Sequence, residues 1–127
     1  MNKTIQILIV DDNFGIRETL SDILVELGYY VDTLDNGYKA VEQVKNKFYD
    51  LVVMDKDMPG NGIVKLKEIK KLYPKIKIIL ITAGSREEKL EEALNGKAYA
   101  VVYKPFDMGK LIKLIEKAIG ETYLVCV

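Results

Sequence analysis

Residues 50–60, DLVVMDKDMPG, carry the pattern that decides the fold. Four apolar residues, 51–54, run directly into Asp55, and a second carboxylate, Asp57, stands two positions later in front of the turn at 58–60. A continuous apolar run of this length, bounded by turn residues, is typical of a strand buried on both faces. Such a strand delivers its terminal carboxylates to one edge of a sheet.

Apolar runs of this kind recur five times along the chain, and segments with helical periodicity separate them. Five alternations of strand and helix predict right-handed crossovers and a parallel sheet with helices on both faces. The expected strands are residues 5–10, 29–34, 51–54, 76–81 and 99–103. The expected helices have apolar faces within 16–27, 40–44, 63–72, 90–94 and 111–119, with Asp107 opening the last and Gly28, Pro74 and Gly120 as stop signals.

The composition excludes several classes of site. With 127 residues the chain is expected to form one domain, and 19 basic against 19 acidic residues give no charge excess for nucleic acid or a membrane surface. The absence of histidine excludes Ser/His/Asp and Cys/His catalysis on this chain. One cysteine and no membrane-length apolar run favour a cytoplasmic protein without a membrane partner.

Charged and hydroxyl side chains stand where four of the five expected strands end. Asp11 and Asp12 follow the first strand, Asp55 follows the third, Thr82 the fourth and Lys104 the fifth. The carboxyl ends of parallel strands share one sheet edge, where open α/β sheets bind ligands. Three carboxylates gathered there repel one another, and a divalent hard cation such as Mg²⁺ relieves that repulsion.

Each of these residues also has an ordinary explanation. Asp12 is suited to capping the first helix, Thr82 is common at a strand end, and a Lys-Pro pair is usual in a solvated loop. Only the second strand ends in a plain turn, at residues 35–37. The joint occurrence at one sheet edge favours a functional site over separate coincidences.

These motifs resemble the receiver domain of bacterial two-component response regulators over nearly the whole chain. The motifs are LIVDD (8–12), LVVMDKDMPG (51–60), ITA (81–83) and KPFD (104–107). The resemblance implies a flavodoxin-like (βα)5 fold, a doubly wound parallel five-stranded sheet in the order 2-1-3-4-5. Stand-alone receivers of the sporulation-phosphorelay type are most similar, and receivers of transcriptional activators are nearly as similar.

The resemblance also implies how the acidic residues act. Asp55 would be the phosphoacceptor, taking a phosphoryl group from a phosphohistidine on a partner. Mg²⁺ would be held by Asp11, Asp12, Asp55 and the backbone carbonyl of Asp57. The implied partners are a histidine kinase or histidine phosphotransferase upstream, and an effector or second phosphotransferase downstream.

The remaining site residues would respond to the phosphoryl group. Lys104 and Mg²⁺ would neutralise its oxygens, and Thr82 would hydrogen-bond it. Movement of Thr82 and Lys104 toward the new charge would pull the loops after the fourth and fifth strands and change the surface that partners meet. Pro105 is expected to follow a cis peptide bond.

Two of three departures from the family pattern concern backbone and aromatic positions. The turn PGNG, 59–62, is one residue shorter than usual, so the loop beside the acceptor is expected to be rebuilt. The position three before Lys104, usually aromatic, is Val101. Tyr99 and Tyr103 are expected to share a strand face with Val101, because side chains alternate between faces.

The third departure is the carboxylate of Asp57, two residues after the acceptor. We hypothesise that this carboxylate alters the lifetime of the phosphoryl group by repelling or orienting the attacking water. The alternative is an exposed loop acid without kinetic effect.

We expect residues 1–120 to form the receiver and residues 121–127 an apolar C-terminal tail. The tail has three alternatives: it extends the last helix, packs along the domain, or pairs with a second chain to give a homodimer. The domain has no basic stripe for direct binding of nucleic acid.

A second hypothesis is a Mg²⁺-dependent phosphatase or phosphotransferase of the haloacid dehalogenase type. DKD, 55–57, formally matches the DxD motif of that family. That family places the motif on its first strand and needs a cap domain, whereas here it follows the third strand of a short chain. A flavodoxin-like FMN site is disfavoured because Asp11 and Asp12 would repel a phosphate. We therefore expect a signalling module, not an enzyme, that catalyses only its own phosphorylation and dephosphorylation.

Overall fold

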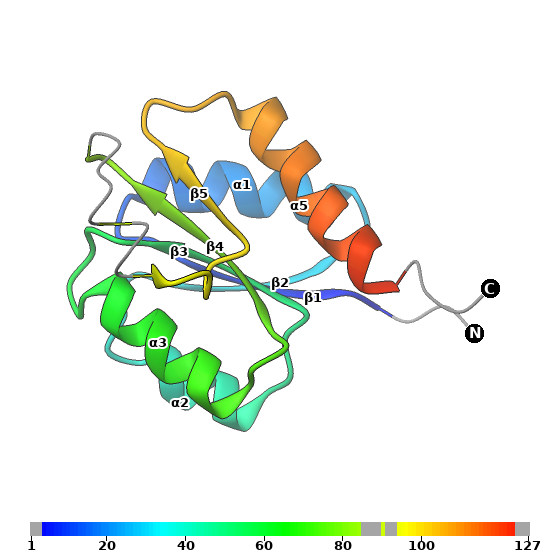
Figure 1. The fold of residues 1–127 in the computed structure, drawn as a ribbon. Helices are drawn as coiled ribbons and strands as arrows, with labels where there is room; N and C mark the ends of the chain where they lie inside the picture. Colours follow the sequence, from blue (N-terminus) through cyan, green and yellow to red (C-terminus); the bar gives the residue numbers. More distant parts are fainter. Residues whose placement is uncertain (1–3, 85–89, 91–93, 124–127) are drawn as a thin grey trace.

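A computed structural model describes residues 4–84, 90 and 94–123 of the protein. Five parallel strands form one sheet in the order β2-β1-β3-β4-β5, which confirms the predicted doubly wound topology (Figure 1). The strands are β1 (Gln6–Val10), β2 (Tyr30–Leu34), β3 (Leu51–Asp55), β4 (Lys77–Thr82) and β5 (Ala100–Tyr103).

Helices cover both faces of the sheet. α1 and α5 lie on one face and α2 and α3 on the other (Figure 1). Their bounds are α1 (Phe14–Glu26), α2 (Ala40–Asn46), α3 (Gly62–Leu72) and α5 (Met108–Tyr123). Most of the helix predicted around 90–94 lies outside the described residues. Leu90 and Leu94, which the structure does describe, are buried. No helix within the described part of the chain is long and apolar enough to cross a membrane.

Two apolar layers form because alternate residues of each strand face opposite sides. On β1, Leu8 and Val10 pack in the layer that also holds residues of α2 and α3, while Ile7 and Ile9 pack in the layer with α1 and α5. The central strand β3 is buried along its whole length, as its uninterrupted apolar sequence predicted. The ends of the strands, and therefore the site, rest on this rigid double core.

The helix ends agree with the sequence signals at most positions. Gly28 follows α1 in a left-handed conformation with φ of 99°, and the Asp107 carboxylate accepts a hydrogen bond from the Lys110 N–H (3.0 Å) at the start of α5. Asn13, not Asp12, caps α1, because its side-chain oxygen accepts from the Ile16 N–H at 2.9 Å. Asp12 is thereby left free of a capping role.

The C-terminal helix is longer than predicted. α5 continues through Gly120 to Tyr123, so Gly120 is not a stop signal. Glu121 accepts a hydrogen bond from the Tyr99 hydroxyl (2.8 Å) and lies 3.8 Å from the Lys77 ammonium, and these contacts hold the last turn against the sheet. The first residues of the expected tail therefore extend the helix, and residues 124–127 lie outside the described part.

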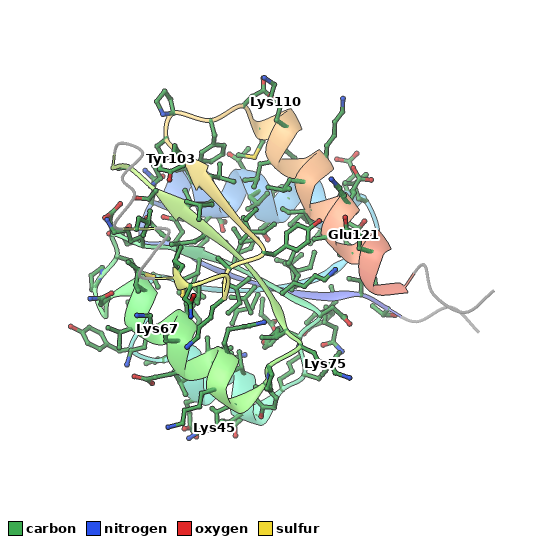
Figure 2. The ribbon with its side chains drawn as sticks, in the orientation of Figure 1. Lys45, Lys67, Lys75, Tyr103, Lys110 and Glu121 are labelled. Atoms are coloured by element: carbon green, nitrogen blue, oxygen red, sulfur yellow. The ribbon has the colours of Figure 1, made fainter. Side chains whose placement is uncertain are left out.

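The prediction about the aromatic residues near β5 is half wrong. Tyr103 packs in the same apolar layer as Val101, but Tyr99 packs in the opposite layer with α5. The reason is that β5 begins at Ala100, so strand alternation does not extend back to Tyr99. Tyr103 lies at the carboxyl end of β5, far along the molecule from Glu121, the partner of Tyr99 (Figure 2).

Candidate functional site

Three carboxylates meet where β1 and β3 end. One carboxylate oxygen from each of Asp11, Asp12 and Asp55 lies within 4.8 Å of the others. The meeting follows from the sheet order, because β1 and β3 are neighbours and Val10 pairs with Met54, one residue before Asp55. Asp11 and Asp55 are buried and Asp12 is exposed. The predicted acidic cluster is therefore present in the fold.

The two carboxylate oxygens of Asp11 differ in their surroundings. Its Oδ1 accepts from the Asn13 N–H at 2.8 Å, and its backbone carbonyl accepts from the Arg17 guanidinium at 2.7 Å. Its buried Oδ2 has no hydrogen-bond partner within the described residues. Burial raises the pKa of Asp11 to about 6. The hydrogen bond from the Asn13 N–H opposes this rise, and the nearby negative charge of Asp55 adds to it to a lesser extent. An unpartnered buried oxygen on a residue clustered with two other carboxylates suits a hard divalent cation.

Asp55 lies between this cluster and the ammonium group of Lys104. The Lys104 Nζ donates to Asp55 Oδ2 at 3.2 Å, and the Asp57 N–H donates to Oδ1 at 2.9 Å. The lysine side chain is a quarter exposed, whereas that of Asp55 is 2% exposed. Lys104 precedes Pro105, and the peptide bond between them is cis, as predicted. The carboxylate thus has a fixed orientation with the Lys104 ammonium beside it.

Thr82 ends β4 beside the acceptor strand and is fully buried. Its hydroxyl oxygen accepts from the Gly84 N–H at 3.1 Å and its O–H donates to Asp57 Oδ2 at 3.4 Å. The Ala83 N–H donates to the same Oδ2 at 2.9 Å. The side chain of Asp57 therefore bridges the loop after β3 to the loop after β4, which the sequence did not predict.

The short turn after β3 is tightly packed against the acceptor backbone. The Gly62 N–H donates to the Lys56 carbonyl at 3.2 Å, and a Cβ on Gly62 would lie only 2.4 Å from the Asp55 carbonyl oxygen. Asn61 adopts a φ of 58° and caps α3 by accepting from the N–H groups of Ile63 and Val64. A positive φ at Asn61 and the absence of a side chain at Gly62 allow the turn to pack this closely.

The same turn also rests on the loop after β2. The Gly37 N–H donates to the Pro59 carbonyl at 2.8 Å, and Gly60, with φ of 98°, leaves no room for a Cβ next to the Tyr38 nitrogen. Residues 35–37, taken as a plain turn, therefore support the acceptor loop from outside. The glycines at positions 37 and 60 are the sequence signal for this contact, because two backbone segments can approach this closely only where a residue has no side chain.

Sequence reasoning missed two further residues at the site. Asn13 both caps α1 and fixes Asp11 through its N–H. Lys56 places its ammonium 3.9 Å from Asp57 Oδ1, and its N–H extends the β3–β4 pairing by donating to the Ile81 carbonyl at 2.7 Å. An asparagine just before a helical periodicity is a recognisable cap signal.

The family model of the response regulator receiver domain matches residues 7–116. The chain belongs to the response regulator receiver family. Chemotaxis protein CheY of Bacillus subtilis (strain 168) is 37% identical to this receiver over 117 residues, which cover 91% of this chain and 98% of CheY. Transcriptional regulatory protein ZraR of Escherichia coli (strain K12) is 38% identical over 122 residues, 95% of this chain. The receiver spans 28% of the length of that relative.

Solved structures of receivers have the same architecture. The CheY-like receiver domain protein of Methanospirillum hungatei JF-1 superposes with a TM-score of 0.87 at 29% identity, covering 94% of this chain and 96% of that one. Response regulator TrrA of Thermotoga maritima, solved in complex with Mg²⁺-BeF, has a TM-score of 0.80 at 37% identity, covering 91% and 99%. The sporulation-phosphorelay subclass stays a prediction.

Family membership separates the two functional hypotheses. The receiver belongs to two-component signal transduction, and receivers of this kind are not enzymes of the ordinary metabolic type. The haloacid dehalogenase hypothesis has no support, because the DKD sequence begins at the last residue of the third strand of a receiver fold. Its second carboxylate, Asp57, is hydrogen-bonded across to β4.

Proposed function

We propose that Asp55 of this receiver accepts a phosphoryl group from a phosphohistidine of a histidine kinase or histidine phosphotransferase. The observation that carries this proposal is the fixed, buried carboxylate of Asp55 between two other acids and the Lys104 ammonium. One Asp55 oxygen would form the new P–O bond while the P–N bond of phosphohistidine breaks and the imidazole leaves. A nucleophile fixed at a strand end gives the in-line geometry that such a transfer needs.

Asp11, Asp12, Asp55 and the backbone carbonyl of Asp57 would hold Mg²⁺. The buried, unpartnered Asp11 Oδ2 and the clustering of three carboxylates support this ligand set. When bound, Mg²⁺ supplies positive charge against the oxygens of the incoming phosphoryl group. The hydrogen bond from the Asp57 N–H to Asp55 would keep the acceptor oxygen in register with that carbonyl.

Lys104 and Thr82 would bind the oxygens of the phosphoryl group on Asp55. The Lys104 ammonium already contacts Asp55 and would pair with a phosphoryl oxygen, while the Thr82 hydroxyl would donate to another. The Lys104 N–H donates to the Thr82 carbonyl at 2.8 Å, so the ends of β4 and β5 would move together. This coupling would change the surface offered to a downstream effector or second phosphotransferase.

Residues 1–120 would provide this function, with residues 121–127 as an extension whose first part completes α5. The domain would act in the cytoplasm, without direct contact to nucleic acid or membrane, and would catalyse only its own phosphorylation and dephosphorylation. For the end of the chain, packing along the domain and pairing with a second copy both stay predictions.

Intact-protein mass spectrometry tests the proposal. The wild-type chain, incubated with acetyl phosphate and Mg²⁺, should gain the mass of one phosphoryl group, and Asp55→Asn should gain none. Asp35→Asn is the matched control, because Asp35 is an exposed acid that follows β2 at the same sheet edge and should leave the gain unchanged. No gain in the wild type with acetyl phosphate or with a phosphorylated kinase domain would refute the proposal.

A further inference from the structure

The side chain of Asp57 occupies two hydrogen-bond donors at the edge of the site. Its Oδ2 accepts from the Ala83 N–H at 2.9 Å and from the Thr82 hydroxyl at 3.4 Å. Its other oxygen lies 3.9 Å from the Lys56 ammonium, and both of those side chains are about one-third exposed or more. An exposed ion pair at that distance contributes little, so the two hydrogen bonds to the β4 loop hold the carboxylate in place.

The backbone of Asp57 is fixed independently of its side chain. Its N–H donates to Asp55 Oδ1 at 2.9 Å, so Asp57 belongs to the acceptor loop while its carboxylate reaches across to the β4 loop. Rotation about the side-chain bonds would therefore release Thr82 and Ala83 without disturbing the acceptor. The carboxylate of Asp57 can therefore move away while the backbone of the acceptor loop stays in place.

The donors that Asp57 occupies are those that a phosphoryl group on Asp55 would need. A phosphoryl oxygen on Asp55 would lie between the strand ends of β3 and β4, and Thr82 is the β4 residue that faces this space. The Ala83 N–H and the Thr82 O–H already converge on one anionic oxygen at Asp57. Two anionic groups cannot share these two protons at full strength.

We propose that the Asp57 carboxylate is an internal competitor of the phosphoryl group for the donors of Thr82 and Ala83. This inference rests on the proposed phosphorylation of Asp55. In the resting receiver Asp57 ties the β4 loop to the β3 loop, and phosphorylation has to displace it before Thr82 can engage the new group. Asp57 is thus a positioning residue that sets how readily the phosphorylated conformation forms.

The size of the effect follows from the two bonds that are displaced. Hydrogen bonds to a charged acceptor are about twice as strong as neutral ones, but each is replaced by a bond to another anion or to water. The net cost of displacing Asp57 is therefore expected to weaken binding of a phosphoryl mimic by roughly tenfold. Removing the Asp57 carboxylate should therefore strengthen binding of the phosphoryl mimic by the same roughly tenfold.

Titration of the isotope-labelled chain with beryllofluoride in the presence of Mg²⁺, followed by amide NMR, tests the proposal. Asp57→Ala should bind beryllofluoride roughly tenfold more tightly than the wild type. The matched control is Asp35→Ala, which removes an equal charge from the same sheet edge but whose carboxylate accepts from Asn36 instead. Its affinity should stay within twofold of the wild type.

The resting state supplies a second readout that needs no phosphoryl mimic. Without beryllofluoride, the Ala83 amide proton should shift upfield in Asp57→Ala, because it loses a carboxylate acceptor, and should stay in place in Asp35→Ala. Unchanged beryllofluoride affinity in Asp57→Ala, or an equal gain in Asp35→Ala, would overturn the competition. Failure of the wild type to bind beryllofluoride in an Asp55-dependent manner would instead contradict the proposed function.

Discussion

At the scale of single residues, Gly62 lets the start of α3 pack directly against the backbone of the acceptor residue Asp55. A Cβ there would lie 2.4 Å from the Asp55 carbonyl oxygen and 2.7 Å from the Lys56 Cα, and both are backbone atoms that cannot rotate away. Gly62→Ala should therefore lower the free energy of unfolding by roughly 2 kcal/mol. Gly15→Ala, in the first turn of α1 with its nearest contact at 3.4 Å, is the control and should be neutral or slightly stabilising. Urea unfolding of both variants measures the difference, and equal stabilities would show that the loop is not tightly constrained.

Asp57 should also influence how long the phosphoryl group persists. Once displaced from Thr82 and Ala83, its carboxylate remains on the loop beside Asp55 and can repel or orient the attacking water. Asp57→Asn should therefore change the rate of dephosphorylation severalfold, measured as loss of the phosphorylated mass after removal of the donor. Identical rates in Asp57→Asn and the wild type would contradict this.

Side chains at the site differ in how far the sequence reveals them. Asp11, Asp55, Thr82 and Lys104 follow from strand order alone, because parallel strands bring their carboxyl ends to one edge. The bridge made by Asp57 does not follow, because it depends on two donors of the β4 loop 25 and 26 residues away. Long-range side-chain contacts of this kind carry no local periodicity.

The edge strand β2 is joined to the β3 side of the sheet by one polar cluster. Asp32 accepts from the Lys47 ammonium at 2.7 Å and from the buried Tyr49 hydroxyl. Burial alone would raise the pKa of Asp32, but the hydrogen bonds from Lys47 and Tyr49 together lower it below its ordinary value of 3.8. Burial and the Asp32 charge raise the pKa of Tyr49 to about 12, so Tyr49 stays protonated at neutral pH. The ionised form of Asp32 is thus the one that the fold stabilises.

Asp32→Asn should lower the free energy of unfolding by roughly 1 kcal/mol at pH 7. Because the pKa of Asp32 is lower in the folded state, its contribution is complete above the ordinary value of 3.8 and is lost as the pH falls through the folded value. Urea unfolding should therefore show a difference in the free energy of unfolding between the wild type and Asp32→Asn at pH 7, and this difference should disappear at acidic pH. Asp35→Asn should unfold with the same free energy as the wild type at both pH values. A difference between Asp32→Asn and the wild type that persists in acid would contradict the stabilising role of ionised Asp32.

Element boundaries were predicted where a backbone signal was strong. Gly28 ends α1 because a left-handed residue suits only glycine well, whereas Gly120 lies inside α5. Contacts of Glu121 with Tyr99 and Lys77 outweigh the weak helix propensity of Gly120. Tertiary contacts with Lys77 of β4 and with Tyr99, just before β5, decide that boundary, and the local sequence pattern does not contain them.

At the scale of the whole molecule, we expect repulsion among the three clustered acids to lower the stability of the free receiver. Asp55→Asn should raise the free energy of unfolding without Mg²⁺ by roughly 1 kcal/mol, because it removes one charge from the cluster around Asp11 and Asp12. Mg²⁺ at a hundred times its dissociation constant should stabilise the wild type by about 2.7 kcal/mol and stabilise Asp55→Asn less. Thermal unfolding with and without Mg²⁺ measures both effects. Equal Mg²⁺ stabilisation of the two proteins would exclude Asp55 as a ligand.

The topology itself was open to prediction from the sequence. Apolar runs at regular spacing with helical segments between them leave few alternatives to a doubly wound parallel sheet, and the receiver motifs specify its strand order. The support of the 59–62 turn by the loop after β2 was not predictable, because it arises only when β2 and β3 take places on either side of β1.

Chemical mapping of the phosphorylated residue tests the central claim most directly. Borohydride reduces an acyl phosphate to an alcohol, so phosphorylated Asp55 would become homoserine, which peptide mass spectrometry locates. After treatment with acetyl phosphate and Mg²⁺, the account predicts this conversion at Asp55, with Asp11, Asp12 and Asp57 unchanged. Conversion at any other aspartate in the wild-type chain, with Asp55 intact, would contradict it.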